Sequence, residues 1–357
     1  MANTLEQYLH KFFDTSSLPR DDLPQYIVVK VNCDRATDFA GIWRRALAKI
    51  DRRKVKAGIE PPATPLADTL SPMPSPGEIA DLLEETKGFA ARLVFIFDEF
   101  ETLQENVKAA FTDLIKSLSD YSIHATIILV GVADTVPELI RHHASIERSL
   151  MQIEMPPMSD QELGEIIANA ERQTELIYQE FVKESIIKLS YGMPFLTHAI
   201  GLGSAEAAVD ARSRVVTASH FSSGIVSAVN TIPGSLRDSY ERGVQSIRSD
   251  ATFEMIILSA AMAQWALRSE FRPKAIIPGL KFLRKKKVSS ANFSRQLKLL
   301  CDGDHANILE SVGKIGSPRY RFSDPLQAVY TLMRGLANGL ITNQELSAIA
   351  IEIFETK

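Results

Sequence analysis

The hydrophobic residues of the first 155 positions form short unbroken runs, whereas those of the later positions recur at helical spacing. Leu93 to Phe97 are five apolar residues in a row, and similar runs occupy 26–32 and 123–132; a shorter strand is expected at 151–155, where apolar and polar residues alternate. A strand that is covered on both faces has no polar side, so such runs predict buried parallel strands. Amphipathic stretches at 1–13, 39–50, 76–87 and 103–118 predict helices before and between them. Strands that alternate with helices predict a parallel, doubly wound α/β sheet.

From residue 156 to residue 232 the pattern predicts helices only, and Ser159 and Glu162 form a capping box that opens this stretch. Beyond it, helices are predicted at 236–248, 252–267 and 290–301. Residues 307–311 and 319–322 flank a turn that contains glycine, which predicts a β-hairpin, and a further helix starts at Asp324-Pro325. Helices followed by a hairpin predict a winged-helix domain.

Composition bounds the class of protein. The chain has 357 residues, 45% hydrophobic and 24% charged, which predicts two or three domains. Its formal net charge of −4 gives no overall bias toward nucleic acid, so any such site is local. Cys33 and Cys301 lie in unrelated contexts, which favours a reducing compartment. The sequence shows no signal peptide and no apolar run of about 18 residues, so we expect a cytoplasmic protein without a membrane span.

Two carboxylates, Asp98 and Glu99, follow the apolar run at 93–97. Ligands of open α/β sheets bind at the carboxyl ends of strands, which is where these side chains are expected. Four apolar residues followed by Asp-Glu form the Walker B pattern of nucleoside triphosphatases. In that pattern Asp98 would hold Mg²⁺, directly or through water, and Glu99 would orient the attacking water. The alternative is an ordinary buried strand followed by an acidic helix cap.

Several further motifs follow in a fixed order. The run at 123–132 ends just before Asp134, and the turn Ser145-Ile146-Glu147-Arg148 comes next. Gly192-Met193-Pro194 opens a later helix, and residues 320–325 read Tyr-Arg-Phe-Ser-Asp-Pro. In this order the motifs resemble bacterial AAA+ ATPases of the origin-recognition-complex-like group, close to the STAND signalling ATPases. The resemblance covers nearly the whole chain.

The resemblance implies ATP and Mg²⁺ as cofactors and assigns roles to single residues. Glu99 and Arg148 would be catalytic, with Arg148 as a trans-acting arginine or nucleotide sensor; its alternative is a surface or strand-capping arginine. Asp134 stands where such ATPases usually carry Asn, Ser or Thr, and an acid cannot donate to the γ-phosphate at neutral pH. Either Thr135 takes over that contact or the site is a poor sensor. Pro194 would lie against the base or sugar of the nucleotide.

The resemblance also implies a division of the chain. Residues 1–155 would form the ATPase core, with a parallel sheet of the P-loop-NTPase type that is truncated at its N-terminus. Residues 156–232 would form a helical lid, 233–340 a winged-helix domain and 341–357 a C-terminal helical tail.

The chain departs from this family in one respect, because it contains no GxxxxGK[ST] loop. Such a loop supplies the backbone N–H groups and the lysine that hold the phosphates. We expect a misplaced start codon or a truncated gene, with a natural nucleotide-free member as the alternative. ATP hydrolysis is therefore expected only if a P-loop lies upstream. We also expect the core to be unstable alone, because the missing strand would lie between 123–132 and 151–155 and leave both inner edges unpaired.

A dense basic run at 281–287 lies beside the helix that a winged-helix domain would place in DNA. Arg295 and Lys298 are three residues apart on that helix, which suits phosphate contacts. The alternatives are a solvated loop and a winged helix that packs on the nucleotide domain. Two classes of function therefore stand: an ATP-driven switch, and a non-enzymatic module that binds DNA or a protein partner. The partners expected are ATP, DNA through the winged helix, and a second copy or another protein.

Overall fold

The computed structural model of the chain consists of two compact units, residues 1–154 and 155–357. It describes residues 7, 25–56, 64–85, 91–132, 149–245, 252–285, 293–313 and 318–355. The helix expected at 1–13 lies outside these residues except for Gln7, which is helical.

The first unit contains a parallel sheet of three strands in the order β1-β2-β3. The strands are β1 (Gln25–Asn32), β2 (Ala91–Asp98) and β3 (Ala125–Leu129). In the register, Asn32 lies opposite Asp98 and Phe97 lies opposite Leu129, so the carboxyl ends of all three strands meet at one edge. The predicted parallel α/β sheet is confirmed.

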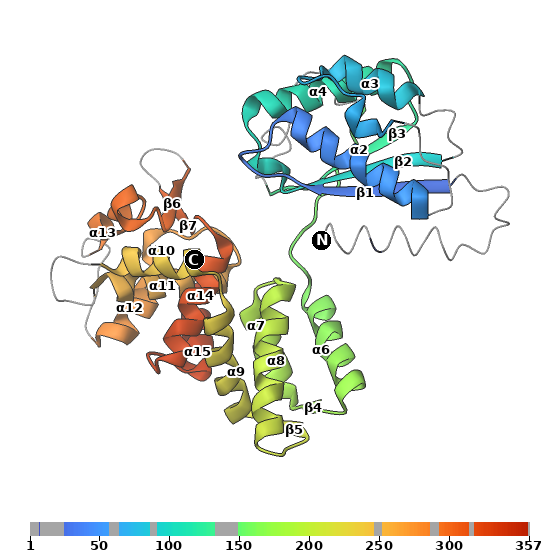
Figure 1. Cartoon of the computed structure of the whole chain (residues 1–357). Coiled ribbons are helices and arrows are strands. Elements are labelled where there is room, and N and C mark those ends of the chain that lie inside the picture. Colours follow the sequence, from blue (N-terminus) through green and yellow to red (C-terminus); the bar gives the residue numbers. More distant parts are fainter. Residues whose placement is uncertain are drawn as a thin grey trace. The chain divides into compact units, whose positions relative to one another are not determined.

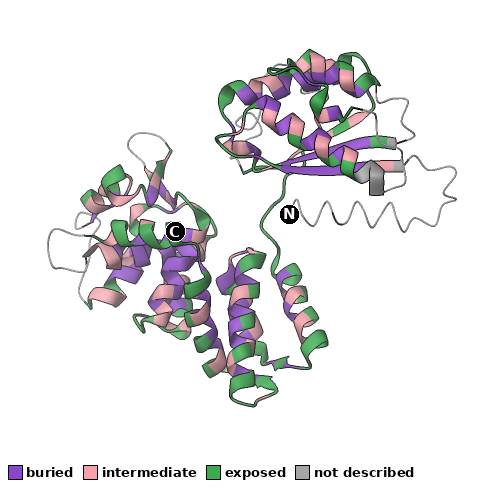
Figure 2. Ribbon diagram, viewed as in Figure 1, coloured by how far each residue is buried: buried purple, intermediate pink, exposed green. Residues whose placement is uncertain are grey.

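Alternate residues of the strands face two different environments. On one face, α2 (Phe39–Lys56), α3 (Pro76–Glu85) and α4 (Glu105–Asp120) pack on the strands (Figure 1). Trp43 is fully buried there, with its ring centroid 5.0 Å from that of Phe95 and 5.4 Å from that of Phe97. Figure 2 shows β1 and β2 mainly in the colour of buried residues, whereas the residues of β3 are intermediate or exposed. The strongly apolar runs of β1 and β2 are therefore explained by burial on both faces.

On the opposite face of the sheet, Val28, Val94 and Ile96 form a small buried cluster of their own. Lys30 and Asp98 continue this face toward the carboxyl ends of the strands, because side chains alternate along a strand. The sheet thus changes from apolar to ionic within two residues of its edge.

The predicted strand at 151–155 is wrong. Residues 150–159 have no regular secondary structure, and Met151 and Ile153 are 87% and 72% exposed. A strand requires the hydrogen bonds of a neighbouring edge, and among the described residues β3 pairs only with β2. The apolar alternation at 151–155 therefore had no edge to join. The expected loss of ladder partners on this strand does not apply.

The second unit begins with four helices: α6 (Asp160–Thr174), α7 (Glu180–Ser190), α8 (Pro194–Asp210) and α9 (Ala218–Thr231). The predicted capping box is present, since Glu162 N donates to Ser159 Oγ at 3.3 Å and Ser159 N donates to Glu162 Oε2 at 2.8 Å. A short parallel pair, β4 (Ile177–Tyr178) and β5 (Val215–Val216), ties together the segments that follow α6 and α8.

The remaining elements form one further group of helices with a hairpin. They are α10 (Gly234–Val244), α11 (Thr252–Leu267), η4 (Pro273–Ile276), α12 (Ile277–Arg284), α13 (Ser294–Leu299), η6 (Gly303–His305), β6 (Leu309–Val312), β7 (Arg319–Phe322), α14 (Pro325–Ala337) and α15 (Asn343–Glu355). The expected hairpin is present: β6 and β7 are antiparallel, and Phe271 forms an additional bridge to Tyr320. The winged-helix assignment of this group stays a prediction.

One hydrophobic core runs through the whole second unit, from Ile167 in α6 to Ile353 in α15. Helix α14 packs against both α9 and α11, so it joins the two groups of helices. The predicted domain limits at 232 and 340 therefore fall inside a continuous core and stay predictions. Among the described residues, no helix combines the length and the apolar character needed to cross a lipid bilayer.

Candidate functional site

Asp98 ends β2 at the carboxyl edge of the sheet, in an ion pair with Lys30 of β1. Lys30 Nζ lies 2.9 Å from Asp98 Oδ2, and the two side chains are 8% and 21% exposed. The second carboxylate oxygen, Oδ1, accepts a hydrogen bond from Glu99 N at 3.1 Å. The carboxylate is thus held by one cation and one backbone donor. Lys30 was not predicted as a site residue, although a lysine inside the apolar run at 26–32 is a visible signal in the sequence.

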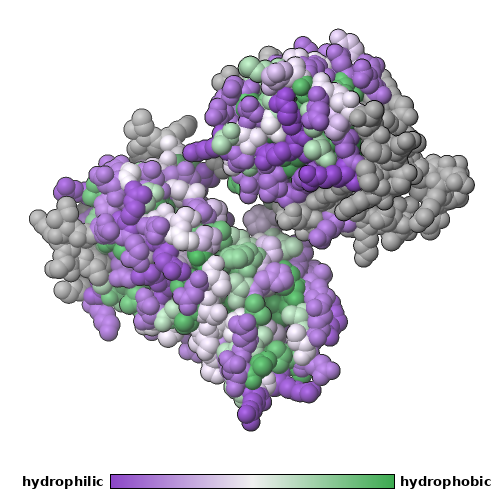
Figure 3. Space-filling view, in the orientation of Figure 1, coloured by the Kyte–Doolittle hydropathy of each residue, from purple (hydrophilic) through white to green (hydrophobic). Residues whose placement is uncertain are grey.

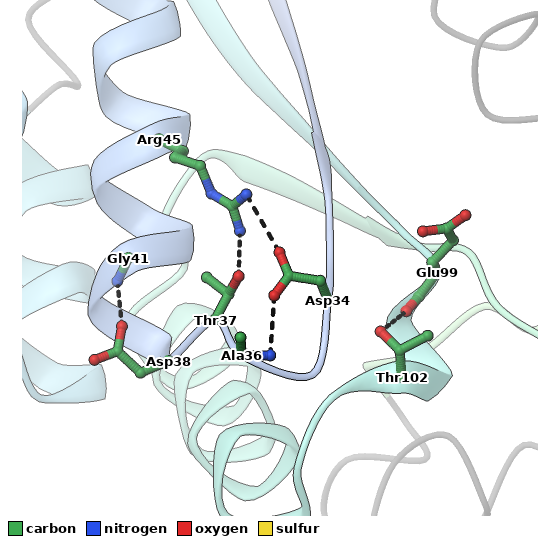
Figure 4. A network of polar contacts seen from close by, with 8 residues as sticks. All are labelled: Asp34, Ala36, Thr37, Asp38, Gly41, Arg45, Glu99 and Thr102. Carbon is green, nitrogen blue, oxygen red and sulfur yellow. Dashed lines mark hydrogen bonds and ion pairs between the residues drawn. The ribbon is translucent and has the colours of Figure 1, made fainter.

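Glu99 adopts a left-handed backbone conformation with φ 57° and ψ 37°, directly after the strand. For a residue with a side chain this conformation costs roughly 1–2 kcal/mol, and it persists where the surroundings impose it. Here Phe100 N donates to Val130 O at 3.0 Å, and Thr102 Oγ1 donates to Glu99 O at 2.8 Å. The Glu99 side chain is exposed, and its carboxylate points away from Thr102 (Figure 4).

The loop after β1 brings a second acidic group to the same edge. Arg45 Nη1, from α2, lies 3.6 Å from Asp34 Oδ2, and Arg45 Nη2 donates to Thr37 Oγ1 at 2.9 Å (Figure 4). Asp34 Oδ1 also accepts from Ala36 N at 2.9 Å. The hydrogen bond from Thr37, followed by those from the backbone and the charge of Arg45, lowers the pKa of Asp34. Asp34 is therefore an anion at neutral pH.

Cys33 precedes Asp34 in the chain and is buried. Its N–H donates to Asp98 O at 2.8 Å, which fixes the end of β1 against the end of β2. Burial raises the pKa of the Cys33 thiol to about 12, and the nearby charges of Asp34, Asp98 and Glu101 add to the effect. The thiol therefore stays protonated at neutral pH, which disfavours a role as a nucleophile.

Pro194, the candidate from the second unit, is the first residue of α8 and is exposed. The turn before it is tightly held. Gly192 has φ +78°, its carbonyl accepts from Met158 N at 2.9 Å, and a Cβ there would lie 2.5 Å from Pro157 Cβ. Helix α8 also exposes Phe195 and Leu202, and Figure 3 shows hydrophobic surface over the region of α7 to α9. Pro194 is therefore presented on a fixed turn.

Asp134, Thr135 and Arg148 lie outside the described residues, so their predicted roles are untested. Among the described residues, no group of three His, Cys, Asp or Glu side chains could hold a metal ion by itself. In the described part of the first unit, the carboxyl edge of the sheet carries three acidic side chains, those of Asp34, Asp98 and Glu99.

Comparison with known proteins gives the fold. No family model matches the chain, and no curated protein matches its sequence. The solved ORC2 protein of Aeropyrum pernix (ADPNP-ADP complexes) is similar over 99% of this chain and 85% of its own, at 13% identity and a TM-score of 0.50. Cdc6p of Pyrobaculum aerophilum is similar over 93% of this chain and 84% of its own, at 14% identity and a TM-score of 0.44. A Walker-type ATPase of Pyrococcus abyssi is similar over 93% of this chain and 94% of its own, at 16% identity and a TM-score of 0.44.

The chain has the fold of the ORC2 protein of Aeropyrum pernix. The likeness spans both units, so the helices that follow the α/β sheet belong to it as much as the sheet does. In the sheet, the Asp98-Glu99 pair occupies the carboxyl end of a central parallel strand, where α/β proteins place their ligands.

Proposed function

We propose that the chain is a cytoplasmic, nucleotide-dependent switch of the AAA+/STAND-like kind, which binds ATP and hydrolyses it when a phosphate-binding loop is supplied upstream. The observation that carries the proposal is the Asp98-Glu99 pair at the carboxyl end of β2, within an AAA+ fold. Glu99 is held in a strained conformation with its carboxylate exposed, as expected of a group that serves a ligand.

Mg²⁺ fits Asp98 as a ligand through water. Mg²⁺ in nucleotide sites is typically held by one or two carboxylates and by the phosphates themselves, so a complete protein cage is not needed. The ion would neutralise phosphate charge. Asp98 Oδ2 already neighbours a cation, Lys30 Nζ, at 2.9 Å, so a divalent ion would share this carboxylate with Lys30. Glu99 would orient the attacking water, being exposed and free of ion pairs in the described part of the chain.

The other roles in the proposal rest on the resemblance of motifs. Arg148 would read the nucleotide or a neighbouring subunit, Thr135 or Asp134 would sense the γ-phosphate, and Pro194 would lie against the base or sugar. The rigid turn at Gly192 supports the role of Pro194, because a contact with a flat base requires a fixed position.

The test is made in a chain extended upstream to include a P-loop. Glu99→Gln should keep ATP binding and lower hydrolysis on the order of a hundredfold, since only the water-orienting carboxylate is removed. Glu85→Gln, at an exposed position of α3, is the matched control and should leave the rate unchanged. Hydrolysis by Glu99→Gln at the parent rate would show that Glu99 is not the catalytic group. Failure of the parent to bind ATP would reject the switch altogether.

A second function, DNA binding by a degenerate ATPase scaffold, is supported by one observation. Arg295 and Lys298 are both exposed on α13, three residues apart and so on one side of the helix. Each phosphate contact that is lost should reduce the slope of log K against log salt by about 1. Arg295→Gln with Lys298→Gln in the full chain should therefore reduce the slope by about 2. Parent-like salt dependence in the double variant would reject α13 as the contact.

A further inference from the structure

A cavity of about 460 Å³ lies within the second unit, apart from the Asp98 site. Cavities of roughly 300–1,000 Å³ hold small organic ligands. It opens to the surface and is bordered by four parts of the chain: the turn before α8, the end of α11, strand β7 and the start of α14. The residues that line it are Tyr191, Gln264, Ser269, Glu270, Arg319, Arg321 and Pro325.

Two guanidinium groups enter the cavity from the same side of β7. Tyr320 and Phe322 are buried, so Arg319 and Arg321, which alternate with them, share the other side of the strand. Arg321 is bound to Glu310, directly across the hairpin. Arg319 is held more loosely: its side chain is 53% exposed, and Glu270 Oε2 lies 3.7 Å from its Nη1. That separation is longer than a hydrogen bond, so the donors of Arg319 remain available to an anion.

Gln264 provides a donor that is fixed in direction. It is only 6% exposed, and its Oε1 accepts a hydrogen bond from Phe322 N at 2.7 Å. Because a backbone N–H can only donate, this contact must involve the oxygen of the amide, which leaves Nε2 on the other side. Within the part of the chain that the structure describes, Nε2 has no hydrogen-bond partner, and Gln264 lines the cavity. Nε2 is not fully buried, so it can donate to a molecule that enters the cavity.

The opposite wall is aromatic and rigid. The Tyr191 hydroxyl donates to Gln264 O at 3.2 Å, and the guanidinium of Arg268 lies 4.7 Å from the centre of the Tyr191 ring. Trp265 Nε1 donates to Lys188 O at 2.8 Å, which ties the end of α7 to the same part of α11. The walls are thus fixed before any ligand binds, which reduces the entropy lost on binding.

We propose that this cavity binds the oxyanion of a small hydroxylated metabolite, such as a sugar phosphate or a hydroxy acid. Arg319 and Gln264 Nε2 hold the oxyanion, with Arg321 beside them. Ser269 and Glu270 accept hydrogen bonds from the hydroxyl groups, and Tyr191 and Pro325 cover the carbon skeleton. Glu270 is the one acidic residue of the lining and Glu310, outside it, pairs with Arg321, so the anion is held by directed donors and not by an excess of positive charge.

The experiment is calorimetric titration of the full chain with three probes: inorganic phosphate, ribose 5-phosphate and malate. Inorganic phosphate should bind saturably with Kd near about 1 mM, and the preferred hydroxylated probe should bind roughly tenfold tighter. The probe that binds tighter, ribose 5-phosphate or malate, shows whether the oxyanion is a phosphate or a carboxylate.

Two variants test the residues. Arg319→Gln removes the loosely held guanidinium, and Gln264→Glu keeps an oxygen for Phe322 N while replacing the Nε2 donor with a second oxygen that repels anions. Each should weaken binding at least about tenfold. Arg214→Gln is the matched control, because Arg214 also forms an Arg–Glu pair, 3.2 Å from Glu175, on an exposed surface away from the cavity lining.

Thermal unfolding checks that Gln264→Glu folds; if it does not, Arg319→Gln decides alone, since its side chain is at the surface. Absence of saturable binding by all three probes would overturn the proposal. Binding that Arg319→Gln leaves at the parent affinity would overturn it as well. Equal affinity for inorganic phosphate and both hydroxylated probes would remove Ser269 and Glu270 from the site.

Discussion

The ion pair between Lys30 and Asp98 should make two adjacent, chemically equivalent substitutions differ sharply in their effect on stability. Asp98→Asn removes the charge opposite a lysine whose side chain is only 8% exposed, whereas Glu99→Gln changes an exposed carboxylate that has no ion pair in the described part of the chain. We expect Asp98→Asn to lower the free energy of unfolding of the first unit far more than Glu99→Gln does.

The magnitude follows from the geometry of the pair. At 2.9 Å and an effective dielectric constant of about 20, two unit charges attract by about 6 kcal/mol, and desolvation of Lys30 offsets part of this. Removing one partner of a buried pair typically costs about 3–5 kcal/mol. Asp98 is 21% exposed, so we reduce the estimate to about 2–3 kcal/mol. Glu99→Gln should stay within about 0.5 kcal/mol of the parent.

The assay is urea unfolding followed by tryptophan fluorescence. The chain has two tryptophans, of which Trp43 lies in the core of the first unit. Trp265→Phe in every sample leaves Trp43 as the only reporter, so the transition measured belongs to the first unit. Lys30→Met and the double variant Lys30→Met/Asp98→Asn complete a double-mutant cycle, which separates the pair from other contacts of Lys30.

The cycle should give a coupling energy of about 2 kcal/mol between Lys30 and Asp98. In the double variant the lysine is gone, so Asp98→Asn should then cost much less than it does alone. Additive effects of the two substitutions, or equal destabilisation by Asp98→Asn and Glu99→Gln, would refute the reasoning.

Two further predictions concern the second unit. Gly192→Ala should destabilise it by about 2 kcal/mol or more, because both φ +78° and the 2.5 Å approach to Pro157 oppose a Cβ. Gly234→Ala is the control and should be neutral, since a Cβ at Gly234 would meet nothing within 4 Å. Equal melting temperatures of the two variants would contradict this prediction. The Tyr178 hydroxyl donates to Gly201 O at 2.9 Å, and burial raises the pKa of Tyr178 to about 12. As pH rises, the unfolded state therefore loses its phenolic proton before the folded state does. The free energy of unfolding should fall as pH rises from about 10 to about 12. Tyr178→Phe should cost about 1 kcal/mol at neutral pH and remove this share of the decline; urea unfolding over that pH range checks it, and an unchanged slope would contradict it.

Local patterns predicted the elements that depend on local physics. The run at 93–97 indicated a strand buried on both faces, and Ser159 with Glu162 indicated the start of α6, because both signals lie within a few residues. The hairpin of β6 and β7 was predicted for the same reason. The strand expected at 151–155 failed because an apolar alternation does not provide the neighbouring edge on which a strand depends.

The chemistry of the candidate sites needed the tertiary structure. Asp98 and Glu99 could be selected from the sequence as acids at the end of a strand, but the cation beside Asp98 is on another strand, and its contact depends on the register of β1 against β2. The left-handed backbone of Glu99 likewise results from contacts with the segment after β3. The cavity around Gln264 is formed by four elements that are far apart in the chain.

The sequence by itself therefore determined the types of element, their order and the acidic end of β2, since periodicity, burial and capping act over a few residues. Only the tertiary structure decided which charges meet. The distance between two side chains on different elements depends on strand order, register and helix packing, and a small shift in any of these would separate Lys30 from Asp98 or Gln264 from Phe322.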